Sequence, residues 1–428
     1  MSPAMLVCLA IFALIFVLRI PIALGMISAA AGYFLVKGAD LGIVCNQVVN
    51  TYYTNYVIIA VPLFIFTANV MNTGRVTEMI FGFANTLCGR FHGALGHVNV
   101  LASLLFAGMT GSAIADAAGL GKIEIDAMNK AGYDPPFSCS ITAASATLGP
   151  IFPPSIPLVI YAMLSETSVG ALFLGGMIPA IILAIGLMGY VRYISRKRNY
   201  PVGEKVGFPV FVGRALRSLP ALLTPVILLA GIYTGVMTPT EAGAIAGFYA
   251  ILISVFAYRA LNFRGLVAVF TDSVRDIGAT SIMIGAASVI SYIVAREQIT
   301  ASLGTWLIGL SENKHFFLLL TNAAILVLGM FIDTSTIQLV FIPILIPVAK
   351  ALGVDLVHFG VVVTFNMMVG LSTPPFGMLL FITSGISGTP LKSIILEILP
   401  QIGVMIAVLF VITYIPDTIL FIPRAVGL

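Results

Sequence analysis

Residues 149–155 read Gly-Pro-Ile-Phe-Pro-Pro-Ser, and residues 370–376 read Gly-Leu-Ser-Thr-Pro-Pro-Phe. Each stretch interrupts a long apolar segment with a glycine and a pair of adjacent prolines. Proline has no backbone N–H to donate and its ring clashes with the preceding turn, so a helix breaks there. The two stretches therefore predict two broken helices, over 137–164 and 357–385.

The two stretches belong to an internal duplication. When the numbering is shifted by 221, residues 105–179 align without a gap with residues 326–400, and 12 of the 75 positions are identical. Many of the identical positions are Gly or Pro, which fix backbone geometry, and this pattern predicts two copies of one structural unit. The identical pairs include Gly108/Gly329, Met109/Met330, Gly132/Gly353, Asp134/Asp355, Gly149/Gly370, Pro153/Pro374, Pro154/Pro375 and Pro179/Pro400.

The composition is that of a membrane protein. Of the 428 residues, 59% are hydrophobic and only 9% are charged, against roughly 25% charged residues in a soluble domain. Apolar runs such as 11–18 and 402–415 are continuous and do not alternate with polar residues, which favours lipid-facing helices over barrel strands. We predict an all-α polytopic membrane protein.

Each half is predicted to follow the same plan. An apolar segment stops at a cluster of Gly and polar residues and resumes as a helix, at 94–131 and again at 315–351. Neither leg is long enough to cross a bilayer comfortably, so each pair is predicted to be a re-entrant hairpin. The broken helix follows, and then a final helix. Other predicted helices are 4–18, 20–37, 56–72, 219–236, 240–258 and 279–295, with amphipathic stretches at 76–90, 262–276 and 297–310.

A basic connection separates the halves. The segment from Arg192 to Arg217 contains seven Lys or Arg residues and one acid, Glu204, and the positive-inside rule places such a segment in the cytoplasm. The predicted units are a first repeat (1–195), the connection (196–217) and a second repeat (218–428). If each repeat crosses the membrane an odd number of times, the repeats are inverted and both termini face the periplasm.

Inverted repeats with broken helices are typical of secondary transporters. A passive channel built on the same repeats is the alternative from another functional class. A channel would need a continuous polar stripe along several helices, whereas the polar residues here cluster at the breaks. This clustering favours alternating access.

The breaks are also the predicted sites of chemistry. Each frees backbone carbonyls beside hydroxyl or amide side chains, which suit a hard monovalent cation such as Na⁺, and the N-terminus of each resumed helix suits a carboxylate. The alternative is that Gly and Pro serve only close helix packing.

Three charged residues are candidates for function. Asp116 and Asp333 lie at the two hairpin turns in apolar surroundings, where an acid usually faces a cavity or a cation. The alternative is that the turns reach interfacial water. Arg296 ends an apolar helix and could bind a substrate carboxylate through both guanidinium nitrogens, or it could be an interfacial arginine paired with Glu297.

Three stretches resemble a known family: GMTGSAIADAAGLGKIEIDAM (108–128), GPIFPPSIPLVIYAML (149–164) and GLSTPPFGMLLFITSGISG (370–388). Together they are similar to the large, DctM-like membrane subunit of tripartite ATP-independent periplasmic (TRAP) transporters, and among the branches to the sialic acid type. The resemblance implies Na⁺-coupled import of an organic acid by an elevator mechanism in the bacterial inner membrane. Sialic acid (N-acetylneuraminate) is the expected substrate, and a C4-dicarboxylate or another carboxylate is the alternative. The implied partners are a periplasmic substrate-binding protein and a small four-helix membrane subunit.

The resemblance also implies roles for individual residues. Two or more Na⁺ ions are expected where the hairpin turns meet the broken helices, and substrate contacts are expected at Arg296, Asp116 and Ser155. The expected Na⁺-site residues are Ser112, Ser145, Gly149, Asp333, Asn366, Gly370 and Thr373. The sequence from Gly119 to Lys122 lacks the spacing of a phosphate-binding loop, so we expect no use of ATP. Nor do we expect an enzyme or a nucleic-acid-binding protein.

Overall fold

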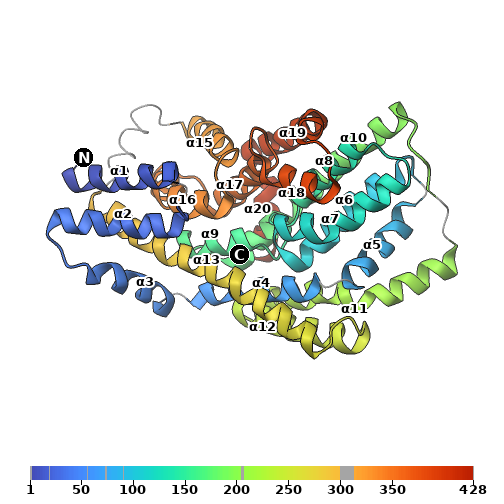
Figure 1. Cartoon of the computed structure of the whole chain (residues 1–428), viewed down its shortest axis with the longest axis horizontal. Coiled ribbons are helices and arrows are strands. Elements are labelled where there is room, and N and C mark those ends of the chain that lie inside the picture. The colour runs from blue at the N-terminus through green and yellow to red at the C-terminus, as the bar shows by residue number, and fades with distance from the viewer. Residues whose placement is uncertain are drawn as a thin grey trace.

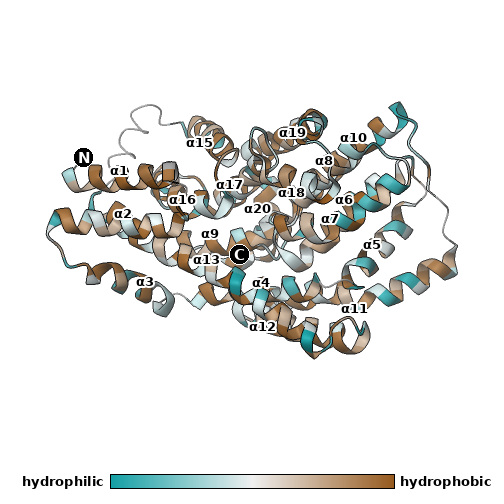
Figure 2. Ribbon diagram, viewed as in Figure 1, coloured by the Kyte–Doolittle hydropathy of each residue, from teal (hydrophilic) through white to brown (hydrophobic). Residues whose placement is uncertain are grey.

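The computed structural model describes residues 2–18, 20–54, 56–72, 75–89, 91–203, 207–298 and 313–427. All of the elements in these ranges are helices, which confirms the predicted all-α class (Figure 1). Six helices are long and apolar enough to cross a membrane, as judged from the described residues. Apolar residues cover most of the outward-facing helix surfaces, and hydrophilic ones gather toward the right-hand end in Figure 2.

The first half contains the hairpin and broken helix at the predicted places. Its elements are α1 (Pro3–Leu18), α2 (Ile22–Lys37), α3 (Gly42–Thr54), η1 (Tyr56–Ile59), α4 (Ala60–Met71), α5 (Arg75–Cys88), α6 (Ala94–Thr110), α7 (Ala113–Lys130), α8 (Pro135–Ala146), α9 (Ile156–Ser165) and α10 (Val169–Lys197). Here α6 and α7 are the hairpin legs, and α8 and α9 are the two parts of the broken helix.

The second half repeats the later part of this order. Its elements are α11 (Phe208–Tyr233), α12 (Pro239–Leu252), η2 (Ile253–Ala257), α13 (Phe263–Arg296), α15 (Lys314–Gly329), α16 (Thr334–Ala351), α17 (Leu356–Leu371), α18 (Met378–Ser387), α19 (Leu391–Tyr414) and α20 (Asp417–Val426). Shifting α7 by 221 gives the bounds of α16, and the same shift places the start of α8 at the start of α17. The duplication read from the sequence is thus repeated in the helix boundaries.

The broken helices form the centre of the molecule and interlock the two repeats. Every residue of α8 from Phe137 to Ala146 is buried, as is every residue of α17 from His358 to Leu371. The second part of each broken helix packs on the hairpin of the other repeat, because α9 contacts α16 and α18 contacts α7. The two breaks and the two hairpin turns are therefore brought to one region.

One predicted division of the second half is wrong. The sequence predicts an amphipathic stretch at 262–276 and a separate helix at 279–295, but α13 runs unbroken over 34 residues. The polar residues that suggest an end, Asp272, Arg275 and Asp276, lie in mid-helix, and Asp276 accepts a hydrogen bond from Asn69 of α4. A helix continues through a turn of polar residues when one of them bonds a neighbouring helix, as Asp276 does here. The amphipathic stretch predicted at 297–310 lies almost wholly outside the described residues.

The connection between the repeats is shorter than predicted, because helices extend into it from both sides. Helix α10 continues to Lys197 and α11 begins at Phe208. Helices α3 and α20 are additional to those predicted. Both carry polar and aromatic or proline residues that reduce their hydropathy below that of a spanning segment.

The close approach of the second hairpin to the second broken helix predicts a stability effect. A Cβ added at Gly370 would lie 2.7 Å from the Cα of Gly329, so the backbones must separate to accept it. We expect Gly370→Ala to lower the free energy of unfolding by about 1–3 kcal/mol through overpacking. Thermal unfolding of the purified protein measures this.

The matched control is Gly385→Ala on α18, where nothing lies within 4 Å of the added Cβ. Equal unfolding temperatures for the two variants would show that the Gly329–Gly370 contact is not tight.

Candidate transport site

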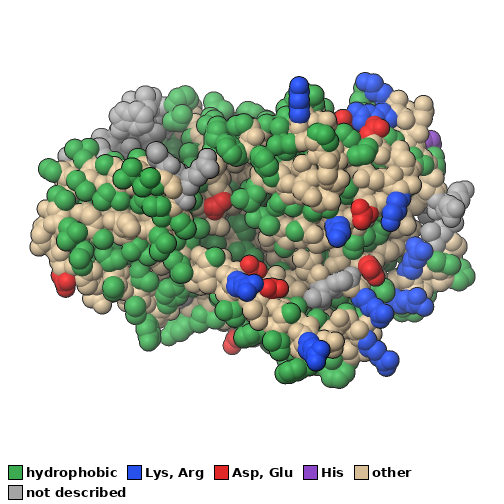
Figure 3. Space-filling view, viewed as in Figure 1, with side chains coloured by type: hydrophobic (Ala, Val, Ile, Leu, Met, Phe, Trp, Pro, Cys, Tyr) green, Lys and Arg blue, Asp and Glu red, His purple; other side chains and the backbone are tan. Residues whose placement is uncertain are grey.

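A cavity of about 440 Å³ lies where the two repeats meet, within the size range of small-molecule sites. Both hairpins contribute to its wall, as do both broken helices and the scaffold helices α4 and α13. The polar lining residues are Asn69, Asn72, Ser112, Asp276, Thr280, Thr334 and Ser335. In Figure 3 the surface is hollowed near the centre of the face shown, between the helices on the left and those on the right.

The hairpin turns begin with equivalent capping residues. Ser112 is the N-cap of α7 and accepts a hydrogen bond from the Ala115 N–H at 3.3 Å. Asp333 is the N-cap of α16, and its carboxylate accepts bonds from the Thr336 N–H at 3.1 Å and the Thr336 hydroxyl at 2.6 Å. The two residues are 221 apart, so they are repeat partners. Side chains at such positions satisfy free N–H groups and sit at the positive end of the helix.

Glycines let the turns touch the breaks. A Cβ at Gly149 would lie 3.2 Å from the backbone of Ser112, and one at Gly111 would lie 2.5 Å from the carbonyl oxygen of Pro154. Gly111 also has a φ of +61°, which favours glycine. Backbone carbonyls freed by the breaks therefore lie against the turns of the hairpins.

A polar cluster joins the first broken helix to the first hairpin. The Ser145 hydroxyl donates to Asn99 Oδ1 at 2.7 Å and lies 3.1 Å from the Ser103 hydroxyl, while the Asn99 amide donates to Thr142 Oγ1 at 2.7 Å. These side chains are all buried. A connected set of hydroxyl and amide oxygens at this depth can exchange its internal bonds for bonds to a cation.

A second cluster occupies the equivalent place in the second repeat. Asn366, the repeat partner of Ser145, donates to the backbone carbonyl of Asn322 at 2.8 Å and to its side-chain oxygen at 3.0 Å. The Asn366 Oδ1 atom is buried and has no hydrogen-bond partner among the described residues. Thr373, which lies in the break directly before Pro374, donates to the Val369 carbonyl at 2.6 Å. An unpartnered buried carbonyl oxygen costs free energy unless something binds it.

The residues predicted for Na⁺ thus fall into two sets related by the duplication. Ser112, Ser145 and Gly149 are the repeat partners of Asp333, Asn366 and Gly370, and each set spans one hairpin turn and one broken helix. Asp333 lines a smaller cavity of about 210 Å³ beside Gly329 and Leu371. Gly149 lies against Ser112 and Gly370 against Gly329. Ser145 and Asn366 lie one turn before these glycines and contact the first hairpin legs at Ser103 and Asn322.

The residues predicted for substrate are not brought together. Asp116 is buried behind the cavity wall, and neither its side chain nor that of Ser155 lines the cavity. Ser155 instead caps α9, accepting from the Leu158 N–H at 3.2 Å, and donates to the Pro150 carbonyl. Arg296 lies at the end of α13, about 30 Å along the helix from Asp276 at 1.5 Å per residue.

Arg296 does not form the ion pair with Glu297 that the alternative interpretation predicts. Glu297 accepts a hydrogen bond from the Tyr33 hydroxyl at 2.7 Å and pairs with Lys37 at 2.9 Å. Hydrogen bonds from Tyr33 and Lys37 lower the pKa of the Glu297 carboxyl to about 2. Arg296 is exposed and, within the described part of the chain, approaches the Tyr292 hydroxyl on its own helix at 3.5 Å. Glu297 therefore ties the end of α13 to α2 and leaves the guanidinium available.

Sequence reasoning missed two groups of residues. The first group is Asn69, Asp276 and Thr280, which line the cavity from the scaffold helices. In the sequence these residues lie within a predicted helix or near a predicted helix end. Glu124 of α7 was also missed, although both its carboxylate oxygens, like those of Asp116, are buried without a partner among the described residues. Helical spacing places Glu124 on the face of α7 opposite the exposed Lys122 and Asp126. This spacing could have indicated that Glu124 is buried.

Re-entrant hairpins, broken helices and a cavity at their meeting point define a membrane transporter of the inverted-repeat class. The comparisons with known proteins agree. A family profile described as "Tripartite ATP-independent periplasmic transporter, DctM component" matches residues 9–418. The chain belongs to this family, and it is a multi-pass transporter subunit rather than an enzyme.

Several relatives are similar over most of their length. The sialic acid TRAP transporter large permease protein SiaM of Vibrio cholerae is 40% identical over 370 residues, covering 86% of this chain and 87% of the relative. The sialic acid permease SiaT of Haemophilus influenzae is 35% identical, over 99% of this chain and 69% of the relative. The C4-dicarboxylate large permease DctM of Pseudomonas aeruginosa is 36% identical, over 87% of this chain and 88% of the relative.

A solved structure shares the fold. The crystal structure of the YdaH transporter of Alcanivorax borkumensis, described as having an unusual topology, superimposes with a TM-score of 0.64. The match covers 87% of this chain and 88% of that chain at 15% sequence identity. At that identity the likeness shows the architecture alone.

The cavity wall predicts a steric effect on transport. Thr280 lines the cavity from α13, so Thr280→Leu would fill part of the space and expose an apolar side chain to the solute. We expect uptake to fall at least tenfold, a loss of about 1.4 kcal/mol, with little change in unfolding temperature. Initial uptake rates in proteoliposomes measure this.

Thr271→Leu provides the control, because Thr271 is exposed on the same helix and does not line the cavity. If both variants lose uptake equally, the cavity is not the path of the solute.

Proposed function

We propose that this chain is the large membrane subunit of a Na⁺-coupled importer of an organic acid, and that the acid is sialic acid. The observation that carries the proposal is the central cavity, whose wall combines both hairpin turns and both breaks with the scaffold helix α13. A site shared by mobile and fixed elements at a repeat interface is what alternating access requires. Sialic acid is favoured over a C4-dicarboxylate because the sialic acid permease SiaM is 40% identical and the C4-dicarboxylate permease DctM of P. aeruginosa is 36% identical.

The donor atoms at the turn–break contacts support Na⁺ as the coupling ion. They are hydroxyl, amide and backbone carbonyl oxygens, which suit a hard cation, and the unpartnered Asn366 Oδ1 is a free ligand atom. In the described part of the chain there is no cluster of three His, Cys, Asp or Glu residues that could hold a metal ion. The two repeat-related sets would hold two ions, one at each contact.

The geometry of α13 supports an elevator. Its 34 residues extend about 50 Å at 1.5 Å per residue, more than the roughly 30 Å of a bilayer core. The cavity meets this helix near Asp276 and Thr280, while Arg296 lies far along it. We infer that the interlocked hairpins and broken helices slide along α13, so that Arg296 meets the substrate in the opposite state. The runner-up, a passive channel, would need a polar path on α13 between these positions, and that stretch is apolar from Ile282 to Ile290 apart from Ser288.

The charge distribution supports the proposed orientation and partners. On the face shown in Figure 3, Lys and Arg side chains lie at the centre and right and none lies on the left. By the positive-inside rule the right-hand end would be cytoplasmic, and an odd number of crossings in each repeat would place both termini in the periplasm. A periplasmic binding protein would deliver the acid at the opposite end. A small membrane subunit would enlarge the scaffold, whose helices α11 and α13 expose Phe208, Leu216 and Phe270.

Uptake into proteoliposomes that also contain the small subunit and the binding protein tests the function. We expect N-acetylneuraminate to accumulate above equilibrium only under an inward Na⁺ gradient, and succinate to fail in the same vesicles. Equilibration without a gradient would establish the channel instead. Accumulation of succinate but not N-acetylneuraminate would contradict the proposed substrate and would still support the Na⁺-coupled mechanism.

The ion site predicts a Na⁺-dependent stability. A ligand that binds only the folded protein stabilises it by about 2.7 kcal/mol at 100 times its dissociation constant. We expect Na⁺, but not choline, to raise the unfolding temperature of the wild type, and Asn366→Ala to lose most of this rise because Oδ1 is removed. Thermal scans over a Na⁺ series measure it.

Asn46→Ala is the control, since Asn46 is an exposed amide on α3 far from the breaks. An unchanged Na⁺ response in Asn366→Ala would exclude this side chain as an ion ligand.

A further inference from the structure

A second cavity, of about 520 Å³, lies at the basic end of the molecule and shares no residue with the transport site. It is formed between α10 and the segment that leads into α6. Its lining residues are Phe91, His92, His97, Ile185, Met188, Gly189, Arg192 and Arg196. Nothing in the proposed transport cycle uses these residues.

The polar side of this basic-end cavity is positively charged and unpaired. Arg192 and Arg196 lie one turn apart on α10, both exposed, and neither forms an ion pair with a described residue. His97 is 7% exposed, and its Nε2 atom has no hydrogen-bond partner in the part of the chain that the structure describes. The Phe91 ring packs against the His97 ring with centroids 5.6 Å apart. A buried nitrogen without a partner, beside two free guanidinium groups, points to an absent anion.

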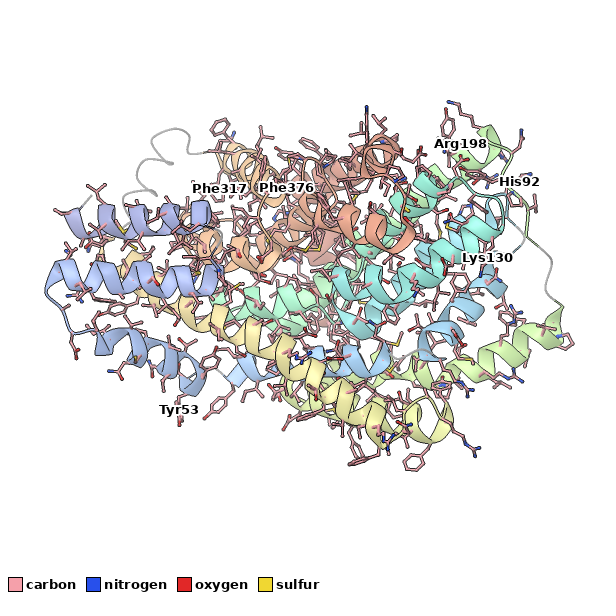
Figure 4. All side chains as sticks on the ribbon, in the orientation of Figure 1. Tyr53, His92, Lys130, Arg198, Phe317 and Phe376 are labelled. Carbon is pink, nitrogen blue, oxygen red and sulfur yellow. The ribbon has the colours of Figure 1, made fainter. Side chains whose placement is uncertain are left out.

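A neighbouring arginine on the same helix is engaged by acids, in contrast to Arg192 and Arg196. Arg198, two residues after Arg196, pairs with Asp134 at 3.0 Å and with Glu397 at 2.9 Å. It thereby fastens the end of α10 to the α7–α8 turn and to α19. Figure 4 shows His92 and Arg198 at the same end of the molecule. The structure therefore supplies acids for one arginine here and none for the pair that lines the cavity.

The cavity changes from apolar to basic along one helix. Ile185, Met188 and Gly189 precede Arg192 and Arg196 on α10, and the 11 residue steps from Ile185 to Arg196 span about 16 Å at 1.5 Å per residue. Ile185 is 64% exposed and lies on a helix long enough to cross the membrane. An apolar groove that ends in two arginines matches a molecule with an anionic head and a hydrocarbon tail.

We propose that this cavity binds an anionic phospholipid of the leaflet at the basic end of α10. The headgroup phosphate would accept hydrogen bonds from Arg192 and Arg196, whose planar guanidinium groups suit phosphate oxygens. The unpartnered Nε2 atom of His97 faces the same place and donates when it carries the ring proton. An acyl chain would lie along Ile185 and Met188. Basic pockets between membrane helices are recognised sites for acidic headgroups. A free phosphate shares the headgroup chemistry but would leave the apolar part of the groove uncovered.

Such a lipid would join two parts of the first repeat. His97 lies in the first turn of α6, the leading leg of the hairpin, whereas both arginines lie on α10. A bound headgroup would neutralise the two arginines and brace α6 against α10. This role is independent of the identity of the transported acid and of the coupling ion.

Thermal unfolding of the delipidated, purified full chain tests the proposal. The probes are phosphatidylglycerol, phosphatidylcholine and inorganic phosphate, each titrated separately. We expect phosphatidylglycerol to raise the unfolding temperature at concentrations at least tenfold below those needed for phosphatidylcholine, with no rise from phosphate. The double variant Arg192→Gln/Arg196→Gln should lose this preference, and since both side chains are exposed, it should fold.

The matched control is Lys122→Gln/Lys130→Gln, which removes two exposed positive charges from α7 (Lys130 is labelled in Figure 4). It should keep the preference for phosphatidylglycerol. An equal loss of this preference in both double variants would show that net charge alone produces it. Equal potency of phosphatidylglycerol and phosphatidylcholine would exclude a specific headgroup site. A rise from phosphate alone, equal to that from phosphatidylglycerol, would assign the cavity to a free anion. Each of these three results overturns the proposal.

Discussion

The structure depends on one constraint: backbone groups freed by a helix break inside a membrane must find partners within the protein. Here the partners are the hairpin turns. Glycines at 111, 149, 329 and 370 let turn and break approach to backbone contact, and capping side chains at Ser112 and Asp333 satisfy the N–H groups that open the second legs. The same arrangement that removes the cost of the breaks leaves oxygen atoms gathered beside a cavity, which is what an ion and a solute need.

Much of the fold was predictable because Gly and Pro fix backbone geometry locally and were copied by the duplication. The hairpins and broken helices follow from that, and their bounds recur at a shift of 221. The continuity of α13 was not predictable, because Asp276 reads as a helix end until Asn69 is seen to donate to it from α4. That contact joins residues 207 apart in the chain, so no local sequence pattern predicts it.

The site was predictable in part for the same reason. The pairs Ser112/Asp333 and Ser145/Asn366 lie on the duplicated framework, so the sequence predicts that Ser112 and Asp333 lie at the turns and that Ser145 and Asn366 lie on the broken helices. The lining of the cavity by Thr280 and Asn69 depends on how the scaffold helices pack against the hairpins, which sequence spacing does not reveal. The capping role of Ser155 was not predictable, because a hydroxyl beside a break can cap its own helix as readily as it can bind a solute.

The central claim is that the interlocked hairpins and broken helices move as one body along α13. Spin labels at Lys130 of α7 and Arg275 of α13, both exposed, would report this motion in a variant whose four cysteines are replaced. Double electron–electron resonance distances should be recorded in lipid with and without Na⁺, N-acetylneuraminate and the binding protein. The account predicts a second distance population that grows when all three are present. A single unchanged distance in a protein that still accumulates substrate would contradict it.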